Sequence, residues 1–526
     1  MRFLILVGFV ALLSACETAP PRPNILLVIS DDQSFPHTSR AGCGWIETPG
    51  FDRVAAEGLY FTNGYAGSPG CAPSRSALVT GRYPWQNEQA GQHAAGWLAR
   101  YVPFVDALDS GGYFTGYTGK GVGPFQYGEP GLRADNAAGP HRYSDIKHAD
   151  DERPASGIGP INYFANFKQF LDDRPDGEPF FFWLGTSEPH RPFEAGSWRQ
   201  AGKALADVTV PPFLPDVPEV RGDLLDYAVE VEWFDAHLLR VLEHLEAIGE
   251  LDNTVVVVTS DNGMSFPRAK ANAYDWGIHV PLAIRYPARF PAGRTVETPV
   301  SFVDLAPTLL ELAGVPPTGM LPMTGESLVS ILEGEGDAEA TRTVLSGRER
   351  HSSSRYQNWG YPQRALRRGD YLLVWNQRPE RWPAGAPQRL VSDTSEALHP
   401  RYGLDTNGLH QSEWAFTDID AAPSKSFIVE HYNDPRYASF FEFAVGKRPE
   451  WELFDVTRDA ACLRNLADDP EHQAQLSDLR ERMTAALRET KDPRVVGPDA
   501  EVFDTYPRYS RMRHFPAPEE EPAVRP

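Results

Sequence analysis

The sequence predicts a layered α/β/α sandwich with a large, mixed but mostly parallel sheet, followed by a smaller C-terminal α+β subdomain with an antiparallel sheet. Three observations predict it: continuous apolar runs of strand length, polar residues at the ends of two runs, and a long amphipathic segment between them. The chain has 526 residues, of which 41% are hydrophobic and 11% aromatic. This composition supplies a large core and excludes a disordered chain.

Three apolar runs predict buried parallel strands. They cover residues 24–29 (NILLVI), 180–184 (FFFWL) and 255–258 (VVVV). The first run is followed by Asp31 and Asp32, and the third by Asp261 and Asn262. Because ligands of open α/β sheets bind at the carboxyl ends of the strands, these two polar endings are expected to meet at one site.

The remaining elements follow from periodicity. Residues 223–251 carry apolar side chains at helical spacing and are expected to pack on the sheet. Residues 364–375 and 451–456 are expected to form strands of the smaller sheet, and residues 471–490 an amphipathic helix. We therefore expect a first domain over 24–355, a C-terminal subdomain over 356–508 and a disordered tail over 509–526.

The first 16 residues have the pattern of an export signal. A basic Arg2 precedes an apolar run that is too short to span a bilayer, and small residues follow. Residues 13–16 (LSAC) resemble a bacterial lipobox, which implies lipidation of Cys16 and a partner membrane held through the lipid anchor. Residues 17–23 would form a tether. The expected protein is an exported bacterial lipoprotein on a periplasmic or cell-surface face, with an ordinary cleaved signal peptide as the alternative.

The charge balance excludes nucleic acid as a partner. The chain has 50 Lys+Arg against 72 Asp+Glu, a formal net charge of −22. Nonspecific nucleic-acid binding needs a basic face for the phosphates. Cys43 and Cys462 are too far apart in sequence to decide whether they pair, and buried free thiols are the simpler expectation.

The most informative motif lies at residues 70–82 (GCAPSRSALVTGR). It resembles the C-x-P-S-R and T-G-R signature of the formylglycine-dependent sulfatases, which have an alkaline-phosphatase-like fold. The resemblance implies that a formylglycine-generating maturation enzyme oxidises Cys71 to formylglycine (3-oxoalanine). One hydroxyl of the hydrated aldehyde would attack sulfur, and the other would then expel sulfate.

The same resemblance extends over most of the chain and implies a metal site. Residues 23–32 (PNILLVISDD) and 256–263 (VVVTSDNG) are similar to the two metal motifs of the family. Carried over by position, Asp31, Asp32, Asp261 and Asn262 would bind one Ca²⁺ together with the modified Cys71. Carboxylate and amide oxygens suit calcium better than zinc.

Further catalytic residues are also implied by matching positions. Arg75 would contact the oxygens of the nucleophile, Lys120 and Lys270 would bind sulfate, and His190 would protonate the leaving group. Many sulfatases place a histidine two residues after the first lysine, whereas this sequence has Val122. His93 and His351 are the candidates to replace it.

Several segments, including residues 119–124, 188–191 and 261–267, resemble the heparan N-sulfatase (N-sulfoglucosamine sulfohydrolase) branch. The implied substrate is a sulfated carbohydrate, with sulfate esters or sulfamates as the bond. An excess of arginine over residues 342–381 indicates that Arg348, Arg350 and His351 line a pocket mouth, with nearby tryptophans stacking on sugars. We expect exo action on terminal sugars, because local positive charge on an acidic protein suits a short unit.

Two other functions remain open at this stage. A phosphate or phosphonate ester hydrolase would share the fold and the formylglycine. A glycan-binding surface lipoprotein without catalysis would explain the missing histidine, although the intact motif from Cys71 to Arg75 argues against it.

Overall fold

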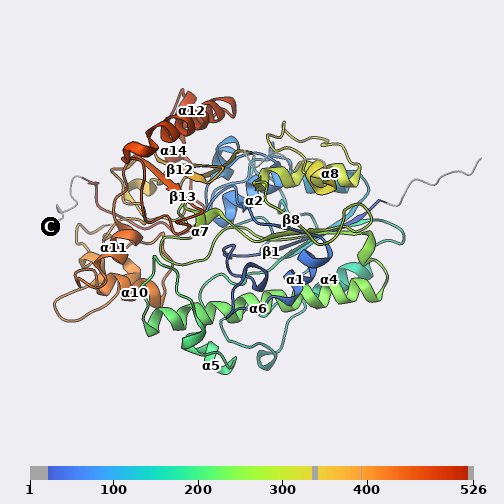
Figure 1. The fold of residues 1–526 in the computed structure, drawn as a ribbon, viewed down its shortest axis with the longest axis horizontal. Coiled ribbons are helices and arrows are strands. Elements are labelled where there is room, and N and C mark those ends of the chain that lie inside the picture. Colours follow the sequence, from blue (N-terminus) through green and yellow to red (C-terminus); the bar gives the residue numbers. More distant parts are fainter. Residues whose placement is uncertain (1–21, 335–341, 393, 519–526) are drawn as a thin grey trace, which may run out of the picture.

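The computed structural model describes residues 22–334, 342–392 and 394–518. Its larger sheet has seven strands in the order β4-β5-β1-β6-β7-β2-β8, and β7 runs antiparallel to both of its neighbours (Figure 1). The strands are β1 (Asn24–Ser30), β2 (Leu59–Phe61), β4 (Phe114–Gly119), β5 (Phe180–Gly185), β6 (Thr254–Ser260), β7 (Leu282–Arg285) and β8 (Arg294–Val296). The predicted mixed, mostly parallel sheet is confirmed, and the three apolar runs are β1, β5 and β6.

Side chains of β1 alternate between two cores, one on each face of the sheet. Leu26 and Val28 pack with helices α1 (Pro49–Glu57), α4 (Tyr163–Asp173) and α6 (Pro218–Ala247). Ile25, Leu27 and Ile29 pack on the other face with α2 (Cys71–Thr80), α3 (Phe104–Ser110) and α8 (Leu305–Ala313). Figure 1 shows α6 and α8 on opposite sides of the sheet, which confirms the three-layer sandwich.

The second sheet is antiparallel and has four strands in the order β10-β11-β12-β13. These are Val344–Arg348, Gln363–Arg368, Tyr371–Asn376 and Trp451–Asp455, and α12 (Gln473–Glu489) shares a hydrophobic core with them. The expected strands and helix of the C-terminal region are present. Because β10 lies before residue 355, this sheet begins inside the segment assigned to the first domain from sequence.

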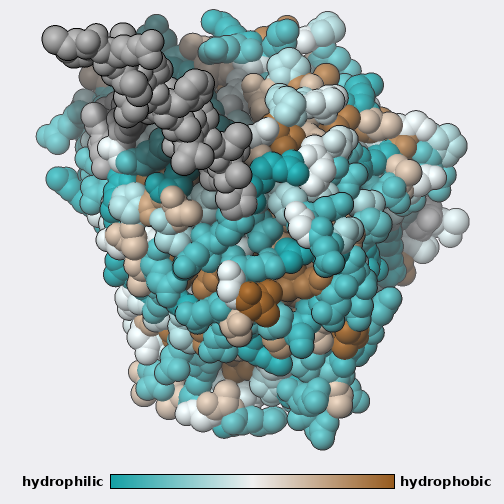
Figure 2. All heavy atoms as spheres, turned by 90° about the vertical axis from the view of Figure 1, so that its right-hand side faces the viewer, coloured by the Kyte–Doolittle hydropathy of each residue, from teal (hydrophilic) through white to brown (hydrophobic). Residues whose placement is uncertain are grey.

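The described chain also has short strands and helices. They are β3 (Gly64–Tyr65), β9 (Val300–Ser301), α5 (Ser197–Gln200), α7 (Asp275–Ile278), α9 (Val329–Glu333), α10 (Pro423–Glu430), α11 (Ala438–Val445), α13 (Pro493–Val496) and α14 (Val502–Thr505). Helices α10 to α12 gather at one end of the large sheet (Figure 1). The opposite end presents a mainly hydrophilic face with small hydrophobic patches (Figure 2).

The expected disordered tail needs a correction over residues 509–518. The backbone N–H of Tyr509 donates to the carbonyl of Ala94 at 2.8 Å, and Phe515 is buried. These contacts fix the segment to the body of the protein, which its Pro- and charge-rich composition did not reveal. Residues 519–526 and the predicted signal, with Cys16, lie outside the described residues. None of the described helices is long and apolar enough to cross a membrane.

Candidate active site

The polar endings of β1 and β6 meet as predicted. The two strands pair in parallel with Ser30 opposite Ser260, so the residues that follow them leave the sheet together. The backbone N–H of Asp32 donates to Oδ1 of Asp261 at 3.1 Å, and Nδ2 of Asn262 donates to Oδ1 of Asp32 at 2.8 Å. Asp32 has a left-handed φ of 74°, which turns the chain sharply after the strand.

Cys71 lies beside this cluster at the first position of α2. Its Sγ and one carboxylate oxygen from each of Asp31 and Asp261 lie within 4.8 Å of one another. All three side chains are buried. Burial raises the pKa of the Cys71 thiol, although Lys120 nearby opposes the shift. The unmodified thiol is therefore a poor nucleophile in this position.

Arg75 follows Cys71 by one helical turn and is fully buried. Its Nε donates to Oδ2 of Asp261 at 2.7 Å, and its Nη2 lies 3.2 Å from Oδ2 of Asp31. A third donor, Nη1, contacts the carbonyl of Gly121 at 2.5 Å. One guanidinium thus ties the nucleophile helix to both strand endings and to the loop after β4.

Two lysines flank the carboxylates. Nζ of Lys120 lies 2.6 Å from Oδ2 of Asp31, and Nζ of Lys270 lies 2.6 Å from Oδ2 of Asp32. Burial alone would raise the pKa of Asp31, but Lys120 and Arg75 outweigh it and hold this pKa well below its usual range. Lys270 also lies 3.2 Å from Oδ2 of Asp420, a partner that the sequence motifs did not identify.

His190 follows β5 and approaches the same carboxylates. Its Nε2 lies 3.9 Å from Oδ2 of Asp32, and its Nδ1 is 2.7 Å from the carbonyl of Arg191. Because a carbonyl only accepts, the neutral ring carries its proton on Nδ1 and leaves Nε2 free. A protonated Nε2 can donate toward the cluster, which is the geometry a general acid needs.

A pocket of about 480 Å³ opens over this constellation. Its walls include Asp31, Lys120, His190 and His93, and also the acidic residues Glu188 and Glu230. Lys120 provides positive charge for an anion, while the carboxylates beside it are placed to hold a cation. The arrangement suits hydrolysis of an anionic ester.

Two oxygen atoms fit the expected metal ion. Oδ1 of Asp31 and Oδ1 of Asn262 are buried and have no hydrogen-bond partner among the described residues. Buried carboxylate and amide oxygens are costly when unpaired, and both are ligands that a hard divalent cation prefers. Together with Asp32 and Asp261, they form a donor set suited to calcium.

Comparisons with known proteins agree with this geometry. The family model described as Sulfatase matches residues 23–315, which cover every predicted metal ligand and Cys71. The chain belongs to the sulfatase family. It is a sulfuric ester hydrolase by this membership, and the expectations of fold and enzyme class drawn from its motifs are confirmed.

Individual relatives support the same family. The sulfatase chain is 28% identical to human N-sulphoglucosamine sulphohydrolase over 93% of its own length and 94% of the relative's. A structure solved with its substrate D-glucosamine-2-N,6-O-disulfate has a TM-score of 0.60 at 20% identity and covers 91% of this chain and 99% of its own. Phosphonate monoester hydrolase of Agrobacterium radiobacter has a TM-score of 0.59 at 17% identity and covers 89% and 96%. The two structures establish the fold alone.

The arginines that were expected at the pocket mouth of this sulfatase are buried in ion pairs and hydrogen bonds instead. Nη2 of Arg348 lies 2.7 Å from Oδ2 of Asp418, and Arg350 donates to the carbonyl of Tyr506 at 2.8 Å. His351 is buried, and burial lowers its pKa to about 3. The local excess of arginine therefore supports the fold, and Arg348 and Arg350 are unavailable to substrate.

The candidate replacements for the missing histidine lie together. The rings of His93 and His351 are 5.2 Å apart between centroids, and His93 lines the pocket with Lys120. Burial and the nearby cations depress the pKa of His93 well below its usual value, so the ring is neutral at pH 7. The sequence could nominate these histidines only as possibilities, because the loops that join them are far apart in the chain.

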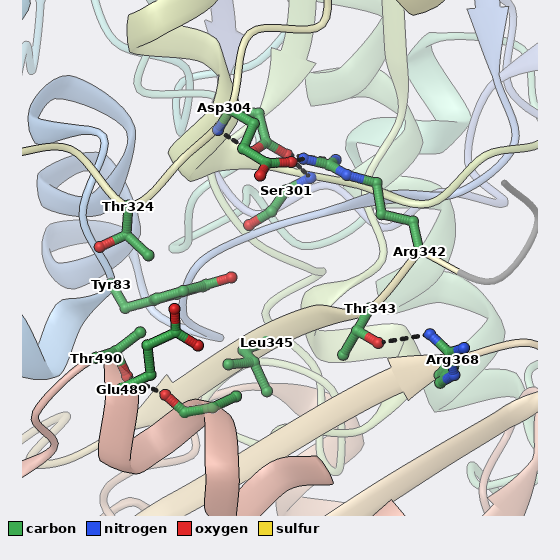
Figure 3. Close-up of a pocket in the computed structure, with 12 residues that line it drawn as sticks. Tyr83, Ser301, Asp304, Thr324, Arg342, Thr343, Leu345, Arg368, Glu489 and Thr490 are labelled. Atoms are coloured by element: carbon green, nitrogen blue, oxygen red, sulfur yellow. Dashed lines mark hydrogen bonds and ion pairs between the residues drawn. The ribbon is translucent and has the colours of Figure 1, made fainter. Parts of the chain in front are cut away.

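A second pocket of about 500 Å³ lies between α12 and the segment from Ser301 to Asp304 (Figure 3). Asp304 pairs there with Arg342 at 2.7 Å, and Glu489 lies beside Tyr83 in the lining (Figure 3). Its walls contain none of the predicted catalytic or metal-binding residues. Cys43 and Cys462 are both free thiols.

Proposed function

We propose that this sulfatase removes sulfate from the terminal sugars of sulfated oligosaccharides or polysaccharides, using a formylglycine formed from Cys71 and one bound Ca²⁺. Sulfate esters are the proposed bond, and sulfamates are the second bond class. One observation carries the proposal: Cys71, Asp31 and Asp261 place ligand atoms within 4.8 Å of one another beneath a pocket that Lys120 lines.

Calcium would be held by Asp31, Asp32, Asp261, Asn262 and residue 71. The unpartnered Oδ1 atoms of Asp31 and Asn262 support this ligand set. The ion would supply charge that polarises the sulfate oxygens and favours the ionised form of the nucleophile.

Formylglycine would be made by a maturation enzyme that recognises the motif from Cys71 to Arg82. The hydrated aldehyde supplies a nucleophilic hydroxyl and a second hydroxyl that allows the aldehyde to reform. Burial keeps the pKa of the Cys71 thiol high, which agrees with a side chain that acts only after oxidation.

The chain's own residues would perform the remaining tasks. Lys120 and Lys270 lie beside the carboxylates, where their ammonium groups can bind sulfate oxygens and offset charge that develops on them. Arg75 orients Asp31 and Asp261. His190, whose Nδ1 is committed to a backbone carbonyl, would present the proton on Nε2 to the leaving oxygen or nitrogen.

The substrate class rests on the relatives. N-sulphoglucosamine sulphohydrolase and the structure solved with glucosamine disulfate both point to sulfated sugars. We propose exo action because the pocket of about 480 Å³ has room for one sugar unit. Hydrolysis of internal units in an intact polymer would contradict it.

We also propose that the protein is exported and anchored to a bacterial membrane through lipidated Cys16. The lipobox-like sequence at residues 13–16 supports this localisation. Mass spectrometry of the mature N-terminus tests it, since an unmodified N-terminus beyond residue 16 would exclude the anchor.

Activity of a Cys71→Ala variant tests the proposed chemistry. With maturation confirmed by the mass of the peptide containing residue 71, the parent protein should hydrolyse an aryl sulfate, and the variant should lose more than about a thousandfold in kcat. Cys43→Ala is the matched control and should keep full activity, because Cys43 lies outside the pocket.

The phosphoester alternative is decided in the same assay. Phosphonate monoester hydrolase shares this fold, so phosphate and phosphonate esters are alternative substrates to be tested. A kcat/KM for aryl phosphate above that for aryl sulfate would transfer the assignment to that reaction. Equal turnover by the parent and Cys71→Ala would refute both.

A further inference from the structure

The C-terminal segment 506–515, named here the strap, is held against the body near the active site. Arg350 donates to the carbonyls of Tyr506 and Pro507 at 2.8 and 3.1 Å. The N–H of Arg513 donates to Oγ of Ser353 at 3.0 Å, and the N–H of Leu390 donates to the carbonyl of His514 at 2.8 Å. Both ends of the strap are therefore fixed by hydrogen bonds.

The strap concentrates arginine side chains. Arg508, Arg511 and Arg513 belong to it and, with Arg389 beside it, make up what we call the arginine cluster. Within the described residues, none of the four forms an ion pair. Nη1 of Arg508 and Nε of Arg389 are buried without a hydrogen-bond partner in the same part of the chain.

The four guanidinium groups repel one another. The pKa of Arg508 is lowered by burial and by Arg513, and that of Arg389 by burial, Arg513 and Arg511. Nearby carboxylates do not neutralise the cluster, because Asp418 pairs with Arg348 and Arg355 and Asp420 pairs with Lys270. Glu413 is a further acidic neighbour, and its charge opposes the lowering of the Arg389 pKa. These arginines thus have no ion-pair partner among the described residues, on a protein whose net charge is −22.

The cluster adjoins the active-site pocket. Tyr509 in the strap donates its N–H to the carbonyl of Ala94, the residue after the pocket-lining His93. Arg508 lies near enough to His93 to help depress the pKa of that ring, after the larger effects of burial, His351 and Lys120. Arg513 lies near Asp420, which binds the catalytic Lys270.

We propose that Arg389, Arg508, Arg511 and Arg513 form a second anion-binding subsite, which binds a sulfate or carboxylate on the sugar unit next to the one that is cleaved. This inference rests on the proposed function. A guanidinium group can bind two oxygen atoms of either anion through paired hydrogen bonds. The subsite lets the sulfatase distinguish a polyanionic glycan from a singly sulfated molecule.

The test compares substrates with and without the second anion. The parent and an Arg508→Gln/Arg511→Gln double variant are assayed on a singly sulfated aryl ester, on a disaccharide with a second sulfate, and on one with a uronate. The double variant should raise KM about tenfold for the two-anion substrates, because two charge-assisted contacts are lost. Its kcat, and its KM for the aryl ester, should stay unchanged. If KM rises for only one of the two disaccharides, the anion that this disaccharide carries, sulfate or carboxylate, is the one that the subsite binds.

Arg482→Gln is the matched control, because Arg482 is an exposed arginine on α12 that pairs with Asp478. It should leave every KM unchanged. An unchanged KM for both disaccharides in the double variant overturns the subsite, as does an equal rise for the aryl ester.

A binding measurement separates this inference from the proposed function. The disaccharides are titrated calorimetrically into the Cys71→Ala protein and into the same protein with Arg508→Gln and Arg511→Gln. A Kd about tenfold higher in the protein that carries the two arginine substitutions supports the subsite, even if no substrate is turned over. Equal Kd values refute it whether or not the parent is active.

Discussion

At the residue scale, we propose that His93 takes the place of the histidine that Val122 replaces. His93 lines the pocket with Lys120 and Asp31, and its depressed pKa keeps the ring neutral and able to accept a proton. We expect His93→Gln to lower kcat about a hundredfold with little change in KM, as is usual when a general base is removed. Turnover of the aryl ester checks this, with exposed His410→Gln as control. An unchanged kcat in the His93 variant would show that another group takes the proton.

The sequence could identify the site residues that directly follow a buried strand or that belong to the continuous motif at residues 70–82. Asp31 and Asp261 follow buried apolar strands, and parallel pairing alone brings them together. Asp420 could not be found this way, because its contact with Lys270 joins segments 150 residues apart. Arg348 was misassigned since local charge does not reveal that Asp418, far along the chain, neutralises it.

At the element scale, α6 illustrates how a helix predicted from its apolar spacing carries polar groups on its buried face. Asp223 binds Arg191 through two contacts of 2.7 Å, and Asp235 accepts from the N–H groups of Gly50 and Phe51 at the start of α1. Glu230 differs, because its Oε1 is buried without a partner in the described structure. Apolar periodicity predicted the helix but not these partners, which lie far away in the sequence.

Glu230 should make stability depend on pH. Burial raises its pKa from 4.5 to about 9, helped by Glu188 and Asp226 and opposed by Arg191. The folded protein therefore keeps a proton that the unfolded chain releases near pH 4.5, and stability falls as pH rises through this window. Glu230→Gln should raise Tm at pH 8 and leave it unchanged at pH 4. Glu243→Gln, at an exposed position on the same helix, should leave Tm unchanged at both pH values. An equal shift at both pH values would contradict a protonated Glu230.

At the scale of the whole molecule, the presence of a large sheet followed by a small one was predictable, because three strands of the first and three of the second show local patterns. The division between them was not, since β10 precedes the expected boundary and the two parts share a core. Trp85, which follows the nucleophile helix, packs with Leu366, Leu373 and Leu453 of the small sheet. Its Nε1 donates to Oγ1 of Thr490 at 3.0 Å after α12. The catalytic motif is thereby packed against the C-terminal region.

This shared core predicts that the protein unfolds as one unit. Calorimetry should give a single transition, because separating the parts would expose Trp85 and the apolar face of the small sheet. Trp85→Ala, at the junction, and Leu245→Ala, in the core beneath the large sheet, should each lower stability by about 3–5 kcal/mol. Both should shift the same transition to lower temperature. Two resolved transitions, with Leu245→Ala moving only one of them, would instead establish that the C-terminal region folds independently of the large sheet.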